Sequence, residues 1–235
     1  MASNGFFIRE RTPVAVVLYG LYLYFSGLSL RGVSKALEHI FPRSHTAVWL
    51  WIQRFGCLAS YFKVGRVDRI AIDETWLKVG CDVMWLWLAI EPYRRKILGF
   101  YLSRTRNILV AELFLARLKK RYGAKPVYTD GANWYPDACR SLGLSHEVYG
   151  DELRSLMERL IQTVKDRTEC FDDYFPCRKE HCRLDHIKAW LNIYSVYYNL
   201  VRRHTTLGAP PCNPTAQPEY ITLQTIANKI RKPLT

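Results

Sequence analysis

The sequence predicts an α/β fold, in which a mixed five-stranded sheet with flanking helices follows a small all-α module. Over the first 60 residues, apolar side chains recur at helical spacing. From Val67 onward, short apolar runs typical of strands come first and then alternate with amphipathic helical patterns. Three acids, Asp73, Asp130 and Glu158, lie in or beside these later elements.

The order of the elements after Val67 predicts how the sheet is built. We expect three strands in succession, then helices alternating with two shorter strands, and finally a long closing helix. The predicted strands are 69–75, 83–91, 96–103, 125–129 and 145–148, and the predicted helices are 107–122, 134–142, 153–168 and 184–203. When three meandering strands are followed by alternating helices and strands, the first and fourth strands can be neighbours in the sheet. This is the order of a ribonuclease H-like fold.

The first 60 residues predict three helices. Pro13 suits an early helical position, and the first helix should extend to about Phe25. Ser29 begins a second helix, Ser44 caps a third, and Gly56 is expected to end it. Two short helices, a tight connection and a third helix match a helix-turn-helix, although another small helical bundle would share the pattern.

The charge balance favours a polyanionic partner. There are 34 Lys and Arg residues against 21 Asp and Glu, a formal net charge of +13. A nucleic acid fits this excess, and the alternative is a basic protein with no such partner. If the third helix enters a DNA major groove, the candidate contacts are His45, Thr46, Trp49, Gln53 and Arg54.

The three acids are expected to hold metal ions. Asp73 ends the apolar run 70–73, Asp130 ends the run 127–130, and Glu158 lies on a predicted helix. A carboxylate in or beside a buried strand is costly unless a charged group compensates it. Because hard divalent cations prefer oxygen ligands, the pattern predicts a magnesium site and phosphoryl-transfer chemistry.

Two neighbouring acids are weaker candidates for this site. Glu152 lies six residues before Glu158, so the two point roughly 120° apart on one helix. Glu152 is better explained as first-turn charge favoured by the helix dipole, whereas Glu158 shares a face with Lys165. Glu74 follows Asp73 directly, and adjacent strand residues face opposite sides of a sheet.

Two further features bear on location and on other chemistry. Seven cysteines with irregular spacing predict reduced thiols in the cytoplasm. The cluster Cys170, Cys177, His181 and Cys182 could bind zinc, but it lacks paired CxxC spacing and zinc is not favoured. The uncharged segment 14–30 is short for a membrane span, and we expect its apolar residues to pack against the helices that follow.

Three stretches together resemble DDE-type transposases of bacterial and archaeal insertion sequences, in particular insertion sequence family six and its archaeal cousins. Residues 27–33 are similar to the helix-turn-helix entry of that family. Residues 71–75 resemble its first acidic strand, and residues 101–106 resemble its third strand. Residues 156–165 resemble the helix that carries its final acid, and residues 198–208 resemble its closing helix. Two departures are a short interval of 27 residues (158 − 130 − 1) between the last two acids, and Arg203 where a proline is common.

The resemblance implies a DNA transposase of the DDE type with a ribonuclease H-like catalytic domain. It implies two Mg²⁺ (or Mn²⁺) ions held by Asp73, Asp130 and Glu158, and transposon ends and target DNA as double-stranded partners. The implied DNA-binding residues are Arg31, His45, Thr46, Gln53, Arg54, Arg159, Lys165, Arg202 and Arg203. We also expect a homodimer or a larger assembly on DNA, and a cytoplasmic, nucleoid-associated location. Neither a membrane nor a small-molecule substrate is expected as a partner.

The expected domains are a helix-turn-helix domain over 1–60, a catalytic domain over 67–210 and a tail over 211–235. Two alternatives remain open at this point. One is a catalytically silent DNA-binding repressor derived from a transposase, and the other is a ribonuclease H-like nuclease. A tyrosine recombinase is disfavoured because the 15 tyrosines lack the accompanying Arg and His pattern.

Overall fold

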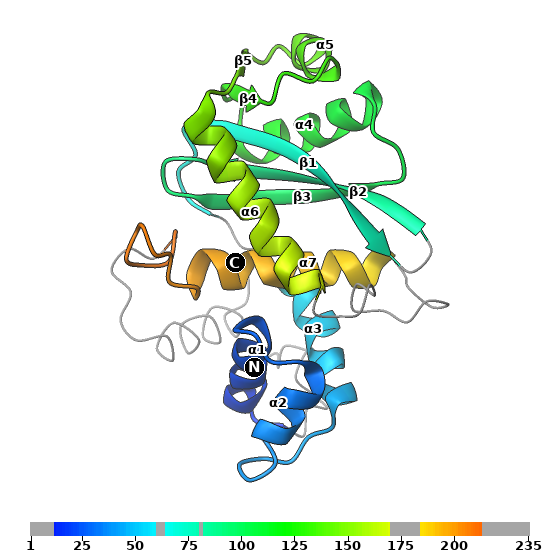
Figure 1. The fold of residues 1–235 in the computed structure, drawn as a ribbon, viewed down its shortest axis with the longest axis vertical. Helices are drawn as coiled ribbons and strands as arrows, with labels where there is room; N and C mark the ends of the chain where they lie inside the picture. Colours follow the sequence, from blue (N-terminus) through cyan, green and yellow to red (C-terminus); the bar gives the residue numbers. More distant parts are fainter. Residues whose placement is uncertain (1–11, 60–63, 80–81, 170–183, 213–235) are drawn as a thin grey trace, which may run out of the picture.

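A computed structural model describes residues 12–59, 64–79, 82–169 and 184–212 of the chain. Three helices come first, and a five-stranded sheet with further helices follows (Figure 1). The expected cluster of Cys170, Cys177, His181 and Cys182 lies outside the described residues, as does most of the expected tail.

The N-terminal helices are α1 (Val14–Phe25), α2 (Leu30–Ala36) and α3 (His45–Ala59). The Ser29 side chain accepts a 3.0 Å hydrogen bond from the Gly32 N–H, and Ser44 accepts one from the Ala47 N–H, which confirms both predicted caps. The predicted end of the third helix at Gly56 is wrong, because α3 continues to Ala59.

Gly56 has a different role from the one predicted. A Cβ atom added there would collide with the backbone of Ala189, so the missing side chain lets α3 approach α7 (Leu184–Leu200) closely. Glycine is therefore required at this position for packing and not to stop a helix.

The sheet has the order β3-β2-β1-β4-β5. Its strands are β1 (Ile70–Val79), β2 (Asp82–Glu91), β3 (Lys96–Ser103), β4 (Val127–Thr129) and β5 (His146–Val148). The first three pair antiparallel, whereas β4 pairs in parallel with both β1 and β5. The predicted mixed sheet and the predicted neighbours, the first and fourth strands, are both confirmed.

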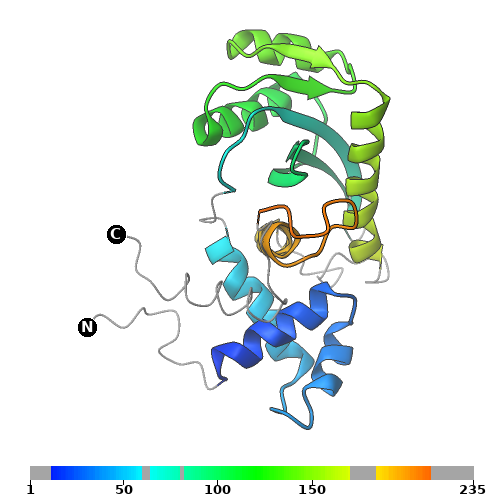
Figure 2. The same cartoon turned by 90° about the vertical axis from the view of Figure 1, so that its left-hand side faces the viewer.

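Helices cover both faces of this sheet (Figure 2). On one face, α4 (Ile108–Tyr122) and α5 (Trp134–Ser141) pack over buried residues such as Ile72 and Trp87. On the other, α6 (Asp151–Glu169) and α7 pack over residues such as Ala71 and Leu88. Helix α6 begins at Asp151, two residues before the predicted start.

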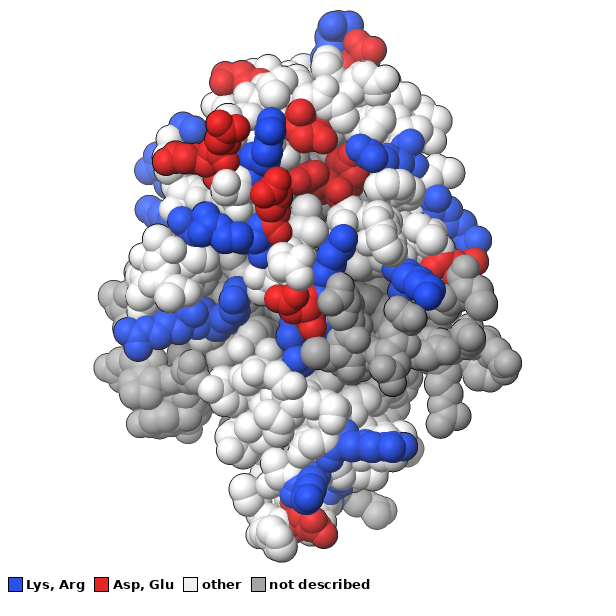
Figure 3. Space-filling view, in the orientation of Figure 1, with Lys and Arg blue, Asp and Glu red and all other residues white. Residues whose placement is uncertain are grey.

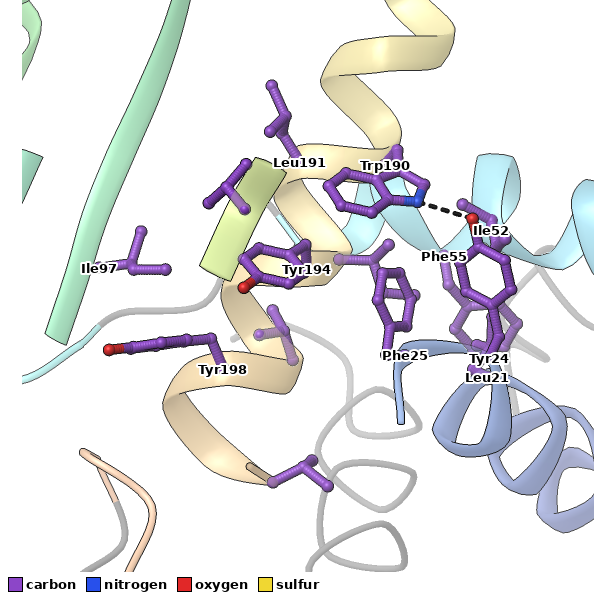
Figure 4. Close-up of a cluster of buried hydrophobic side chains, with 14 of the residues drawn as sticks. Leu21, Tyr24, Phe25, Ile52, Phe55, Ile97, Trp190, Leu191, Tyr194 and Tyr198 are labelled. Atoms are coloured by element: carbon purple, nitrogen blue, oxygen red, sulfur yellow. Dashed lines mark hydrogen bonds between the residues drawn. The ribbon is translucent and has the colours of Figure 1, made fainter. Parts of the chain in front are cut away.

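The N-terminal helices share the core of the α6–α7 face. Tyr24 and Phe25 of α1 lie against Trp190 of α7, whose Nε1 donates a 2.9 Å hydrogen bond to the Tyr24 hydroxyl (Figure 4). The apolar residues of α1 thus pack inside the protein, as expected for the 14–30 segment. Among the described helices, none is both long and apolar enough to cross a membrane.

Asn199 attaches α7 to the outer strand of the sheet. Its side chain accepts a 2.9 Å hydrogen bond from the Ile97 N–H and donates one of 2.8 Å to the Ile97 carbonyl. The register between β2 and β3 shifts at this place, at Ala89 and Ile90. A buried amide thus satisfies backbone groups at the edge of the sheet, which would otherwise be costly to bury.

Candidate active site

Asp73 lies half-buried in β1, on the face of the sheet that α6 covers. Its Oδ1 accepts a 2.8 Å hydrogen bond from the Glu74 N–H, and its Oδ2 accepts one of 3.2 Å from the Tyr149 hydroxyl. Tyr149 is buried between β5 and α6, and its own N–H donates to the Thr129 carbonyl. Both carboxylate oxygens of Asp73 therefore have fixed partners.

Asp130 lies exposed directly after β4, the strand that pairs in parallel with β1. The parallel pairs Ile70 with Val127 and Ala71 with Tyr128 set the two strands in register, so that Asp73 and Asp130, each three residues past the first pair, lie at the same level. The Asp130 Oδ1 accepts a 3.0 Å hydrogen bond from the Ala132 N–H, which shapes the turn. The topology thus brings two of the three predicted acids together.

The pKa of Asp73 reflects both its burial and the nearby charge of Asp130. Burial raises the pKa of Asp73 to about 6, and the negative charge of Asp130 acts in the same direction. The Glu74 N–H, the Tyr149 hydroxyl and the Arg106 charge act against the rise in this pKa. An acid disfavoured in its charged form beside a second acid is a setting in which a bound cation relieves repulsion.

Glu158 is the third predicted acid, and it is exposed on α6. Buried residues of α6, among them Met157 and Leu160, pack into the core shared with β1. Within the part of the chain that the structure describes, no three His, Cys, Asp or Glu side chains are arranged to hold a metal ion. The structure therefore pairs Asp73 with Asp130, and the role of Glu158 stays a prediction.

Charged side chains gather around this edge. Figure 3 shows acidic side chains grouped over the upper part of the face that carries α6, with Lys and Arg side chains beside them. On α6, the Lys165 Nζ lies 5.2 Å from the ring centre of Trp76, an exposed residue of β1. Arg159 is exposed, and its Nε donates to the Ser155 carbonyl one turn earlier.

A second cluster, which the sequence interpretation missed, lies on the opposite face of β1. Glu74 points away from Asp73, as the strand alternation predicted. Its Oε1 accepts a 2.8 Å hydrogen bond from the Arg106 Nε, and its Oε2 accepts one from the Tyr135 hydroxyl. Burial is the main cause of a raised pKa for Glu74. A sequence signal was present, since a second acid followed Asp73 in an apolar strand.

The predicted DNA contacts of the N-terminal helices differ in exposure. Arg31, His45 and Thr46 are exposed, whereas Gln53 and Arg54 are half-buried farther along α3. A cavity of about 470 Å³ lies beside the start of α3. Its lining includes three cationic residues, of which sequence interpretation identified only the first: Arg31, Lys35 and Arg43.

The predicted contacts after α7 take part in local structure. The Arg202 guanidinium lies 5.4 Å from the ring centre of Tyr198, and the Arg203 Nε donates a 2.7 Å hydrogen bond to the Gly208 carbonyl. The His204 Nδ1 accepts from the Thr206 N–H, and burial lowers the pKa of His204. These residues close the loop that follows α7.

Comparisons with known proteins match most of the chain. A family model described as a DDE domain matches residues 67–202. An uncharacterized protein of Methanocaldococcus jannaschii is 34% identical over 206 residues, which cover 87% of this chain and 95% of that protein.

Retroviral integrases are among the similar solved structures. The catalytic core domain of BIV integrase has a TM-score of 0.45 at 18% identity, over 68% of this chain and 97% of that one. The HTLV-2 integrase catalytic core domain in complex with magnesium has a TM-score of 0.47 at 12% identity, over 62% and 94%. A chain of the simian T-cell lymphotropic virus intasome in complex with PP2A regulatory subunit B56 gamma has a TM-score of 0.49 at 14% identity, over 85% and 74%.

Proposed function

Since the chain belongs to the DDE domain family of insertion-sequence transposases, with its ribonuclease H-like fold, we propose that it cleaves transposon ends and joins them to target DNA. The observation that carries the proposal is the parallel register that sets Asp73 of β1 level with Asp130 at the end of β4, on a strand that α6 contacts. Two carboxylates placed against each other at a strand edge, on a basic protein, suit phosphodiester chemistry on a polyanion.

The proposed metal ligands are Asp73, Asp130 and Glu158. The donor set fits Mg²⁺ or Mn²⁺, because all the donors are carboxylate oxygens and a cation would relieve the repulsion that helps to raise the pKa of Asp73. When bound, two such ions would activate the attacking oxygen and stabilise the departing oxygen of the phosphodiester. Glu158 is the proposed third ligand because it is exposed on α6, the helix that packs against the strand of Asp73.

The proposed DNA contacts divide into two groups. Beside the acids, Arg159 and Lys165 of α6 would hold phosphates of the cleaved strand, and Arg202 and Arg203 would support the same duplex. In the N-terminal module, the proposed contacts with the terminal inverted repeat are Arg31, His45, Thr46, Gln53 and Arg54. Because transposition holds two ends together, the proposed active form on DNA is a homodimer or a larger assembly.

A strand-transfer assay tests this function. Oligonucleotides with the inverted repeats that flank the gene are incubated with target plasmid, protein and Mg²⁺. We expect joined products from the wild type, and at least about 100-fold fewer from Asp130→Asn, since loss of a metal ligand removes several kcal/mol of transition-state stabilisation. The matched control is Asp137→Asn, an exposed acid of α5 that pairs with Arg140 and should retain joining.

Each outcome assigns a function. Joining by Asp130→Asn at the wild-type rate would overturn the proposed site. Metal-dependent cleavage of the DNA without joining would indicate a nuclease. Specific binding to the repeats without any cleavage would indicate a repressor.

A further inference from the structure

A buried carboxylate next to Asp73 has no part in the proposed metal ligation. The Glu74 side chain has 0% of its surface exposed, and it points to the face of β1 opposite Asp73. Both of its oxygens are used, one by Arg106 and one by the Tyr135 hydroxyl. A buried ion pair is often no more stabilising than apolar residues of the same size, so stability alone is a weak reason for this arrangement.

The partners of Glu74 are themselves held rigidly. The Arg106 guanidinium carbon lies 4.8 Å from the ring centre of Trp85 and 4.4 Å from that of Trp134. The Tyr135 ring packs edge-on against Trp87. A planar guanidinium between two aromatic rings has little freedom to turn, so its hydrogen bond to Glu74 has a defined direction.

These contacts join three segments that meet at the acids. Glu74 directly follows Asp73 in β1, Arg106 lies in the loop between β3 and α4, and Tyr135 lies five residues after Asp130. The Glu74 carboxylate therefore connects the backbone beside Asp73 to the segment that leaves Asp130, through the sheet from the opposite face.

We propose that Glu74, held by Arg106 and Tyr135, is a positioning residue that sets the separation of Asp73 and Asp130 for metal binding. This inference rests on the proposed metal site. Glu74 does not touch the metal; it acts through the backbone of β1 and the first turn of α5. Small errors in ligand placement weaken a metal site strongly, because ligand supports of this kind typically change affinity by about 10–100-fold.

The decisive variant is Glu74→Asp, which keeps the negative charge but is one methylene too short to reach both partners. Mn²⁺ binding to the DNA-free protein is measured by electron paramagnetic resonance, and folding is checked by thermal unfolding without metal. We expect Glu74→Asp to weaken Mn²⁺ binding by about 10-fold. Tyr135→Phe, which keeps the ring and removes only the hydroxyl, should weaken it less, by about 3-fold.

A matched control separates positioning from simple loss of a buried acid. Glu91 is also buried, with 1% of its surface exposed, and its oxygens accept from the Tyr93 and Arg94 N–H groups in the turn after β2. Glu91→Asp should lower the unfolding temperature while leaving Mn²⁺ affinity within twofold of the wild type, since the turn it supports is separate from the acids.

The outcomes distinguish this inference from the proposed function. Unchanged Mn²⁺ affinity in both Glu74→Asp and Tyr135→Phe, together with a large loss in Asp73→Asn, would overturn the positioning role alone. Unchanged affinity in Asp73→Asn would overturn the metal site on which both depend. An equal loss in Glu74→Asp and Glu91→Asp would show a general effect of stability and would also overturn the positioning role.

Discussion

The Tyr149 hydroxyl donates a 3.2 Å hydrogen bond to the Asp73 Oδ2, and so connects the segment before α6 to the central strand of the sheet. Tyr149 lies between β5 and the helix that carries Glu158. A single contact therefore relates the first predicted acid to the start of the helix that bears the third.

Tyr149→Phe should lower both the stability of the protein and its rate of DNA cleavage. The ring stays in its buried place, so the free energy of unfolding should fall by about 1 kcal/mol, the usual effect of one hydrogen bond. Asp73 would lose a fixed direction, and we expect cleavage to fall about 5-fold. Cleavage kinetics and urea unfolding measure the two effects.

The control for that variant is Tyr122→Phe, which removes a 2.7 Å hydrogen bond to the Leu98 carbonyl away from the acids. It should show a similar change in the free energy of unfolding, with cleavage unchanged. Equal losses of cleavage in both variants would contradict a specific role for Tyr149.

The raised pKa of Asp73 predicts how the stability of the metal-free protein depends on pH. An acid whose pKa rises on folding binds its proton more tightly in the folded state. Its contribution is fully present below the unfolded value of 3.8 and is lost as the pH rises through about 6. Relative to Asp73→Asn, the wild type should therefore lose about 2 kcal/mol of unfolding free energy between pH 4 and pH 7.

Urea unfolding of both proteins in a chelator measures this difference. His146 and His204, whose pKa values are lowered by burial, titrate in both proteins and cancel from it. A difference that stays constant with pH, or grows in favour of the wild type as pH rises, would contradict the prediction.

Gly56→Ala should destabilise the protein. Helix propensity alone would make alanine stabilising by about 1 kcal/mol in the middle of a helix. The added methyl group would instead meet the Ala189 backbone and push α3 away from α7, at a cost of about 1–3 kcal/mol. The sign of the change in unfolding free energy decides between the two effects.

Lys165→Ala should weaken binding to transposon-end DNA and reduce its dependence on salt. If Lys165 contacts one phosphate, the slope of log affinity against log salt concentration should fall by about one. Lys188→Ala, an exposed lysine of α7 whose Nζ lies 3.8 Å from Asp185, is the matched control and should leave the slope unchanged. Equal slopes for the wild type and Lys165→Ala would remove Lys165 from the proposed interface.

Local patterns in the sequence were enough to predict the order of the elements. The strand 96–103 has the predicted bounds, and the pairing of β1 with β4 follows from the order of the strands and helices. Asp73 and Asp130 could be placed together because the order of the elements makes their strands neighbours. The first strand is longer than predicted, since it continues past Thr75 into a hairpin with β2.

Contacts between distant segments could not be predicted in this way. Glu74 bonds to residues 32 and 61 positions away, and no periodic pattern relates a strand residue to a loop arginine and a helix tyrosine. Gly56 was interpreted from its usual role at helix ends, because its actual neighbour is 133 positions away (189 − 56). Such roles depend on tertiary packing, which local propensity does not encode.

The core that α1 and α3 share with α7 bears on how far from its recognition sequence such a protein would cut DNA. Within the described residues, a buried tryptophan and a helix contact without side-chain space join the helical module to α7, which packs on the sheet. The number of base pairs between the sequence that such a protein reads and the bond that it cuts would then be a constant of the folded chain. An insertion of any length between the repeat and the cleavage site would then move the bond away from the acids and prevent its cleavage.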